Sequence, residues 1–187
     1  HDLGQPIHAF DVKKIKGNKV IVRKANKGEK LITLDDKERV LKDTDLVIAN
    51  AQEPMALAGV FGGANSGISN NTNSIFIESA YFNPVTVRKT AKSFTLNTDA
   101  SYRYERGTDP NIVEEALNKV VKLVQELAGG LASYLPIEHY PSKIENFKVD
   151  LELRNIKRIL GIEIPKQKII NILIILCTKL TLLYMFV

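Results

Sequence analysis

The sequence predicts an α+β fold, with strands in the first part of the chain and helices in the remainder. Short β-branched runs separated by turn-forming residues recur as far as Ala80. Pairs that start helices, Asn-Pro and Asp-Pro, occur only later, at Asn83 and Asp109. A run of strands followed by a run of helices is typical of an α+β domain.

The totals describe a globular chain that is large enough for one domain and part of a second. It has 187 residues, 44% hydrophobic and 25% charged. The net charge of +5 favours a polyanion such as nucleic acid as partner, although a lysine-rich solvated surface explains it equally well. The single Cys177 excludes an internal disulfide framework, and three histidines leave little for a zinc site. Because initiator methionine and signal peptide are both absent, we expect a fragment of a longer protein.

The first strands are predicted from β-branched runs. Residues 1–11 contain Gly and Pro and predict a loop. Lys19–Lys24 is predicted as a strand, and Lys30–Leu34 with Glu38–Leu41 as a hairpin around an acidic turn. Asp45–Ala49 is predicted as the next strand.

The following stretch has the features of a pocket wall. Pro54–Gly63 is apolar and bears glycines, which allow close approach to the backbone. Asn65–Asn73 is rich in Asn, Ser and Gly and predicts an exposed loop. Ser74–Ala80 has a strand pattern that contains Glu78 near its end.

Helices are predicted beyond this point. A basic helix covers Val85 to Phe94, after Asn83 as its N-cap. The clearest helix begins at Asp109-Pro110 and ends at Gly129-Gly130. Its apolar residues recur at helical spacing, at Val113, Leu117, Val120, Val121, Val124 and Leu127.

A second unit is predicted after a proline-containing linker. Val149 to Leu153 alternate as a strand does, Arg154–Leu160 is helical up to Gly161, and another helix starts at Lys166. From Ile169 to Val187, 15 of 19 residues are apolar. A membrane span needs ~20 apolar residues without a central charge, and Lys179 lies in the middle. We therefore prefer a core helix followed by a truncated strand.

Few residues are candidates for chemistry. Neither a serine-hydrolase motif nor a phosphate-binding glycine loop occurs in the sequence. Glu78 is the sharpest candidate, because a carboxylate at the end of a β-branched run needs a partner; a salt bridge to an arginine is the alternative. His8 is either functional or a half-buried loop histidine. Thr98, Asp99, Ser101 and Glu105 are further polar candidates. Arg103 and Arg106 either contact phosphates or pair with acidic neighbours, namely Asp99, Glu105 and Asp109.

Four blocks carry a resemblance to a known family. They are Gly4–Asp11, Ala56–Gly63, Ile77–Pro84 and Asn97–Pro110. In this order they resemble the B3/B4 editing domain of the β subunit of bacterial phenylalanyl-tRNA synthetases. Leu153–Pro165 resembles the start of the adjoining B5 domain of the same family.

The resemblance implies an architecture. It predicts a B3/B4-type editing domain at residues 1–135 with β-sheets and flanking helices, a linker at 136–147 and a partial, winged-helix-like B5 domain at 148–187. The family carries a Thr-Asn pair shortly before its first block, and we expect that pair to precede His1 in a longer protein.

The resemblance also implies an activity, the hydrolysis of tyrosine mischarged onto tRNA(Phe). Catalysis is expected from His8, which places water near the ester, and from Glu78. Substrate binding is expected from Glu78, which accepts the phenol of tyrosine, from the Gly62 amide, and from Thr98 and Ala100, which line the pocket. We expect these five positions to converge on one cavity.

Partners and cofactors follow from the same resemblance. It implies that the parent enzyme would be a cytoplasmic α2β2 phenylalanine–tRNA ligase that joins Phe to tRNA(Phe) using ATP and Mg²⁺, with that chemistry in its α subunit. We therefore expect no metal site and no cofactor in this chain. The candidates for tRNA binding are basic residues: Arg88, Lys89, Lys92, Arg103 and Arg106.

Two other functions remain open. One is a non-catalytic tRNA-binding module on the same fold, and the other an inactive gene product. A Glu78 that is free in the pocket favours the editing enzyme, whereas a Glu78 sealed in a salt bridge favours the binding module.

Overall fold

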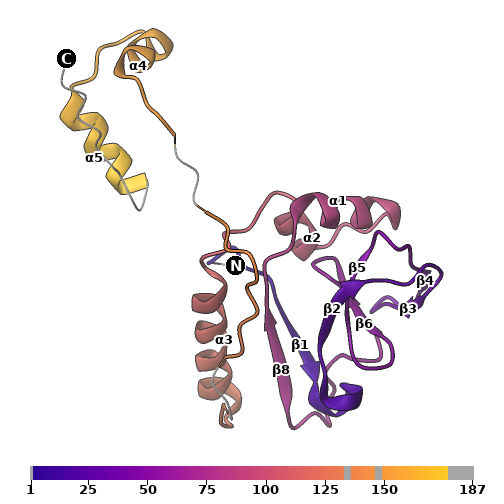
Figure 1. Ribbon diagram of the computed structural model, residues 1–187. Helices are drawn as coiled ribbons and strands as arrows, with labels where there is room; N and C mark the ends of the chain where they lie inside the picture. Colours follow the sequence, from indigo (N-terminus) through magenta and orange to yellow (C-terminus); the bar gives the residue numbers. More distant parts are fainter. Residues whose placement is uncertain (1, 133–135, 146–148, 177–187) are drawn as a thin grey trace. The chain divides into compact units, whose positions relative to one another are not determined.

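The computed structural model describes residues 2–132, 136–145 and 149–176 (Figure 1). The chain divides into two compact units, His1–His139 and Tyr140–Val187. Among the described residues, the first unit combines antiparallel sheets with three α-helices, and the second contains two α-helices. The mixed α and β architecture expected from the sequence is therefore present.

The first unit holds a four-stranded antiparallel sheet in the order β2-β5-β6-β7. Its strands are Ile21–Lys24, Leu46–Ala49, Pro54–Leu57 and Phe61–Gly62. The apolar run expected at Pro54–Gly63 is thus two strands joined by a tight turn. Gly59 makes the turn with φ 69°, and a Cβ there would lie 2.9 Å from the Phe82 ring. A larger residue would therefore meet both backbone strain and a collision.

Two smaller antiparallel pairs complete the strands. The expected hairpin consists of β3, Lys30–Ile32, and β4, Glu38–Val40. A separate ribbon pairs β1, Ile7–Asp11, with β8, Ile75–Ser79 (Figure 1). The loop prediction for residues 1–11 was wrong for β1, because this strand is defined by a partner far away in the sequence rather than by a local pattern.

Short and long helices follow. Val12–Lys14 and Lys16–Asn18 form 3-10 turns, and α1 covers Pro84–Ser93 with the Asn83 side chain accepting from the Val85 and Thr86 amides. The helix α2, Asp99–Tyr104, was not predicted. The last helix of the first unit, α3, covers Val113–Ala128. It begins later than expected, because the Asp109 carboxylate accepts from the Asn111 amide in a turn that precedes it.

The core lies between the four-stranded sheet, the ribbon and the first two helices. Its most buried side chains include Phe10, Val47, Leu57, Val60 and Val87. A buried hydrogen bond of 2.8 Å from Thr90 on α1 to Asp45 fixes this helix at the start of β5. On the ribbon, the Ser79 hydroxyl donates to the Val113 carbonyl, so that α3 runs alongside β8 (Figure 1).

The second unit contains α4, Leu153–Leu160, and α5, Lys166–Leu176. Gly161 ends α4 in the left-handed conformation, as the sequence predicts. The strand expected at 149–153 was wrong: residues 149–152 form no strand, and Leu153 begins α4. The strand expected at the end of the chain lies outside the described residues.

Across the residues that the structure describes, we found no helix with the length and apolarity needed to cross a membrane.

Candidate functional site

The first unit contains a cavity of about 170 Å³ between the β1–β8 ribbon, the β6–β7 turn and α2. All five residues proposed from the sequence as catalytic or substrate-binding line it: His8, Gly62, Glu78, Thr98 and Ala100. The rest of the wall is mainly apolar, with Leu57 and Val60 among its members. The fold thus brings together residues more than ninety positions apart in sequence.

His8 and Glu78 are direct cross-strand neighbours. They are paired in the antiparallel register of β1 and β8, so that both side chains project from the same face of the ribbon. Phe10 and Phe76 form the next pair on that face, and the rings of His8 and Phe10 meet edge-on at 4.4 Å. The two candidate catalytic groups therefore lie side by side on one face of the ribbon, next to a pair of phenylalanines.

Glu78 is a carboxyl group in apolar surroundings. Among the described residues it has neither a hydrogen-bond partner nor an ion pair. The residue is half-buried, and desolvation in the cavity raises the pKa of Glu78 to about 7. The group is therefore partly neutral and partly charged near neutral pH. A hydrogen-bond donor that enters the cavity stabilises its charged form.

His8 is held as a neutral imidazole. Burial lowers its pKa below the usual value of 6.5. Its Nε2 atom is buried and has no hydrogen-bond partner within the described part of the chain. The ring lies directly against Gly62: a Cβ at this glycine would lie 2.6 Å from His8 Cε1. A glycine is thus required at position 62 for the imidazole to occupy its place.

Thr98 and Ala100 enter the cavity wall from the start of α2. The Thr98 hydroxyl accepts from the Ser101 amide at 3.0 Å and donates to the Val60 carbonyl at 2.7 Å. The Ser101 hydroxyl in turn accepts from the Thr98 amide at 3.0 Å, which completes a capping box. Because its only hydrogen is already donated, Thr98 can fix the wall and accept a further bond but cannot act as a proton donor.

The sequence of this chain matches a known protein family. The sequence model of a family described as B3/4 domain matches residues 1–129. The chain belongs to the B3/4 domain family.

Three curated relatives of this B3/4 domain protein carry the name phenylalanine–tRNA ligase beta subunit. The relative from Bacteroides thetaiotaomicron is 46% identical over 172 residues, 92% of this chain. Those from Protochlamydia amoebophila and Thermotoga maritima are 44% and 40% identical over 90% and 88% of it. The chain spans about a fifth of the length of these relatives, 21% in each case.

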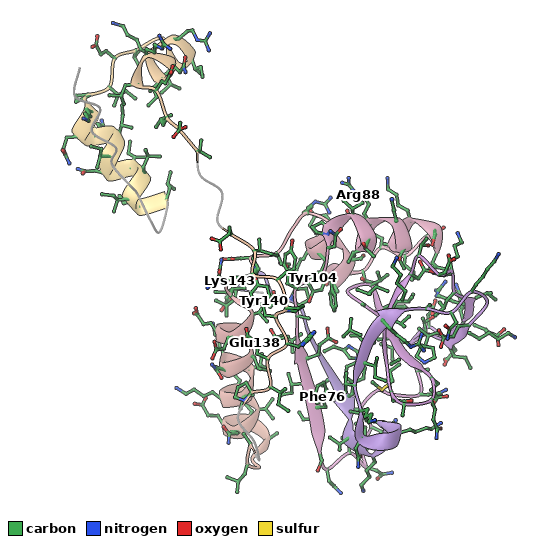
Figure 2. The ribbon with its side chains drawn as sticks, in the orientation of Figure 1. Phe76, Arg88, Tyr104, Glu138, Tyr140 and Lys143 are labelled. Atoms are coloured by element: carbon green, nitrogen blue, oxygen red, sulfur yellow. The ribbon has the colours of Figure 1, made fainter. Side chains whose placement is uncertain are left out.

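The five basic residues proposed for tRNA binding do not line the cavity of this B3/4 domain. Arg88, Lys89 and Lys92 are exposed on α1, and Figure 2 shows Arg88 directed away from the strands. None of the three has a hydrogen bond or ion pair with another described residue. Arg103 is half-buried on α2, and Arg106 pairs with Glu105 at 2.7 Å and stacks on the Tyr102 ring.

Sequence reasoning missed two polar residues next to the site, Gln5 and Tyr104. Tyr104 lines the cavity from α2, and Figure 2 shows it between this helix and the strands. Burial first and the charge of Glu78 second raise the pKa of its phenol well above the usual value. The spacing of four residues from Ala100 would have indicated a shared helix face, had α2 been predicted.

Metal ligands are not gathered in the described residues. No group of three or more His, Cys, Asp or Glu side chains there could hold an ion.

Proposed function

We propose that this chain is part of a phenylalanine–tRNA ligase β subunit and that its cavity hydrolyses the ester of tyrosine mischarged onto tRNA(Phe). Three features support the proposal: membership of the B3/4 domain family, relatives with that name, and the convergence of the five positions on one cavity. The observation that carries it is the unpaired Glu78 carboxyl opposite His8.

Glu78 is suited to recognise the hydroxyl group that distinguishes tyrosine from phenylalanine. A phenol donates a charge-assisted hydrogen bond to the carboxylate, worth roughly 1.5–3 kcal/mol. A phenylalanine ring leaves the buried carboxylate without a donor, at a cost of similar size. A site that hydrogen-bonds a substrate hydroxyl rejects the analogue without it by up to about 10⁴.

A second site of this kind compensates for the limited selectivity of the pocket that binds phenylalanine for aminoacylation. A hydrophobic pocket for phenylalanine rejects an added hydroxyl by only about 10², which is too little for accurate translation. Hydrolysis of the wrong ester at a separate site, where the hydroxyl is read directly, removes the error. This division of labour places recognition of tyrosine in the present chain.

The reaction needs an oriented water molecule rather than a nucleophilic side chain. The water oxygen attacks the ester carbonyl carbon, the bond from that carbon to the ribose oxygen breaks, and a hydroxyl of the terminal ribose relays the proton to the leaving oxygen. His8 is neutral and lines the cavity, and we expect one of its ring nitrogens to accept a hydrogen bond from the attacking water. Gly62 supports this imidazole by close contact.

The alternative is a non-catalytic tRNA-binding module. That function favours a Glu78 that is locked in an ion pair, whereas no such pair exists among the described residues. The free carboxyl supports the editing enzyme. A module of that kind would bind tyrosylated and uncharged tRNA equally, because it would have no use for a reader of the phenol.

The partners of the parent enzyme belong to the same proposal. We expect tRNA(Phe) as substrate and an α subunit in an α2β2 assembly in the cytoplasm, with ATP and Mg²⁺ used by the α subunit. Residues 148–187 are expected to begin the B5 domain. The unpaired cations on α1, together with Arg103, are expected to contact tRNA phosphates.

The test is a deacylation assay with tRNA(Phe) carrying tyrosine or phenylalanine. The complete β subunit with its α subunit is expected to release tyrosine and to spare phenylalanine. Equal, uncatalysed loss of both amino acids would reject the editing function and leave the binding module and the inactive gene product as the alternatives.

A further inference from the structure

We infer that Gln5 and Tyr104 are positioning residues that close the end of the β1–β8 ribbon and thereby hold His8 opposite Glu78. The inference rests on the proposed hydrolytic function for its consequence, but the clamp itself is a matter of geometry. Neither residue was assigned a role by the sequence.

The ribbon needs such a clamp because its ladder ends at a proline. The last strand pair is Ile7 with Ser79, and the next pair in register is Pro6 with Ala80. Pro6 has no N–H and cannot donate to the Ala80 carbonyl. A two-stranded ribbon is only marginally stable on its own, and the His8–Glu78 pair lies just one position inside this end. Loss of pairing here would separate the two functional groups.

Side chains supply the missing donors. Gln5 Nε2 lies 2.7 Å from the Ala80 carbonyl oxygen and 3.1 Å from that of Pro6. The Tyr104 hydroxyl lies 3.0 Å and 3.3 Å from the same two oxygens, and Gln5 Nε2 lies 3.2 Å from the phenol oxygen. The two N–H groups of Gln5 and the one O–H of Tyr104 thus meet three acceptors. Both strands are tied to α2 through this network.

The orientation of the Gln5 amide follows from its surroundings. The nitrogen faces two carbonyl oxygens, so that exchanging the amide oxygen and nitrogen would place three acceptors against one another. Gln5 is buried, and its Oε1 atom has no partner among the described residues. An unsatisfied buried acceptor such as Oε1 lowers the stability of the fold. We take this as a sign that glutamine occupies position 5 because of the hydrogen bonds that its Nε2 donates.

The same network keeps Tyr104 from satisfying Glu78. Tyr104 is a phenol beside the very carboxyl that is proposed to recognise a phenol, and it is close enough for the charge of Glu78 to affect its pKa. Its single hydrogen is directed to the backbone carbonyls, so that it is not donated to Glu78. Tyr104 therefore does not compete with the phenol of the substrate for the Glu78 carboxyl group.

The test uses Tyr104→Phe, which keeps the buried ring and removes only the hydroxyl, and Gln5→Met, which keeps most of the volume and removes the donors. Tyr102→Phe is the matched control, because it makes the same chemical change at an exposed position of the same helix. Amide hydrogen exchange, followed by mass spectrometry on the full chain, reports the ribbon directly. Deacylation of tyrosylated tRNA by the complete enzyme reports the positioning.

In Tyr104→Phe, peptides that cover β1 and β8 are expected to exchange roughly fivefold faster than in the control, the factor that one lost hydrogen bond gives. For hydrolysis, kcat is expected to fall by a similar factor with little change in KM, because the ring that lines the cavity remains. The double variant leaves both carbonyls without donors and is expected to lose more than the product of the single losses.

Two results overturn the inference. If exchange in β1 and β8 is the same in Tyr104→Phe, Gln5→Met and Tyr102→Phe, the clamp does not exist. If exchange accelerates while kcat is unchanged, the clamp is structural only and does not position the site. If the unaltered enzyme fails to hydrolyse tyrosylated tRNA, the proposed function falls, and the exchange comparison still decides the clamp.

Discussion

Replacing Glu78 by glutamine is expected to make the chain more stable above neutral pH. The pKa of Glu78 is raised from 4.5 to about 7 by burial, so the folded chain holds this proton more tightly than the unfolded chain. As pH rises from 4.5 to 7, Glu78 loses its proton in the unfolded state but keeps it in the folded state. The free energy of unfolding therefore falls over this window. Glutamine cannot ionise and escapes the loss.

The magnitude follows from the shift. A displacement of roughly 2.5 pKa units at about 1.4 kcal/mol each gives about 3 kcal/mol at pH 8. The difference shrinks to about 1 kcal/mol or less at pH 5, because this pH lies only slightly above the unfolded-state pKa of 4.5, so little of the ionisation free energy has yet been lost. Glu78→Gln is thus expected to exceed the wild type in stability by these amounts, while the amide oxygen, which still accepts a phenol, preserves part of the preference for tyrosine.

The assay is urea unfolding of both chains at several pH values between 4 and 8. Glu138→Gln is the control, because this substitution makes the same change in charge at an exposed position. The reasoning about Glu78 fails if the stability difference between Glu78→Gln and the wild type is independent of pH, or if the control shows the same dependence. A stabilised variant with impaired discrimination would mean that the site sacrifices stability for recognition.

Three further outcomes are expected. Gly62→Ala places a Cβ 2.6 Å from the His8 ring, so deacylation of tyrosylated tRNA should fall at least tenfold, and a rate equal to that of wild type refutes the contact. Thr98→Val removes the cap of α2 and the bond to Val60, which should lower the free energy of unfolding by about 1–2 kcal/mol in denaturant titrations. Affinity for tRNA should fall with salt by about 0.7–0.9 in logarithmic slope for each phosphate contact, and the slope should decrease when alanine replaces the α1 cations Arg88, Lys89 and Lys92.

The sequence predicted best where local patterns decide structure. The β3–β4 hairpin around its acidic turn, α1 with its Asn83 cap, and the helices separated by Gly161 all follow from signals within a few residues. The convergence of His8, Gly62, Glu78, Thr98 and Ala100 was predicted from the family resemblance alone. No periodicity in the sequence contains that information.

The failures have a common physical cause. β1 was missed because its partner β8 is far away in sequence, and Gly4 and Pro6 beside it are typical of a loop. α2 has only six residues, too few for a periodic pattern, although its capping box at Thr98 was a usable signal. The strand expected at Val149–Leu153 shows that alternation over five residues cannot establish a strand without a partner.

The pairing of β1 with β8 also has a consequence for the order of events during synthesis. Gln5 and Ala80 are 75 positions apart in the chain, and α2, which holds the clamp, follows later still. Contacts of such long range must first overcome the entropy of closing the intervening loop. At about 5–20 residues per second, a ribosome needs several seconds to make this stretch. A chain interrupted before α2 therefore contains both His8 and Glu78 but lacks the Tyr104 hydroxyl that ties the end of their ribbon. Under the proposed hydrolytic function, we therefore expect full activity only after α2 has been made.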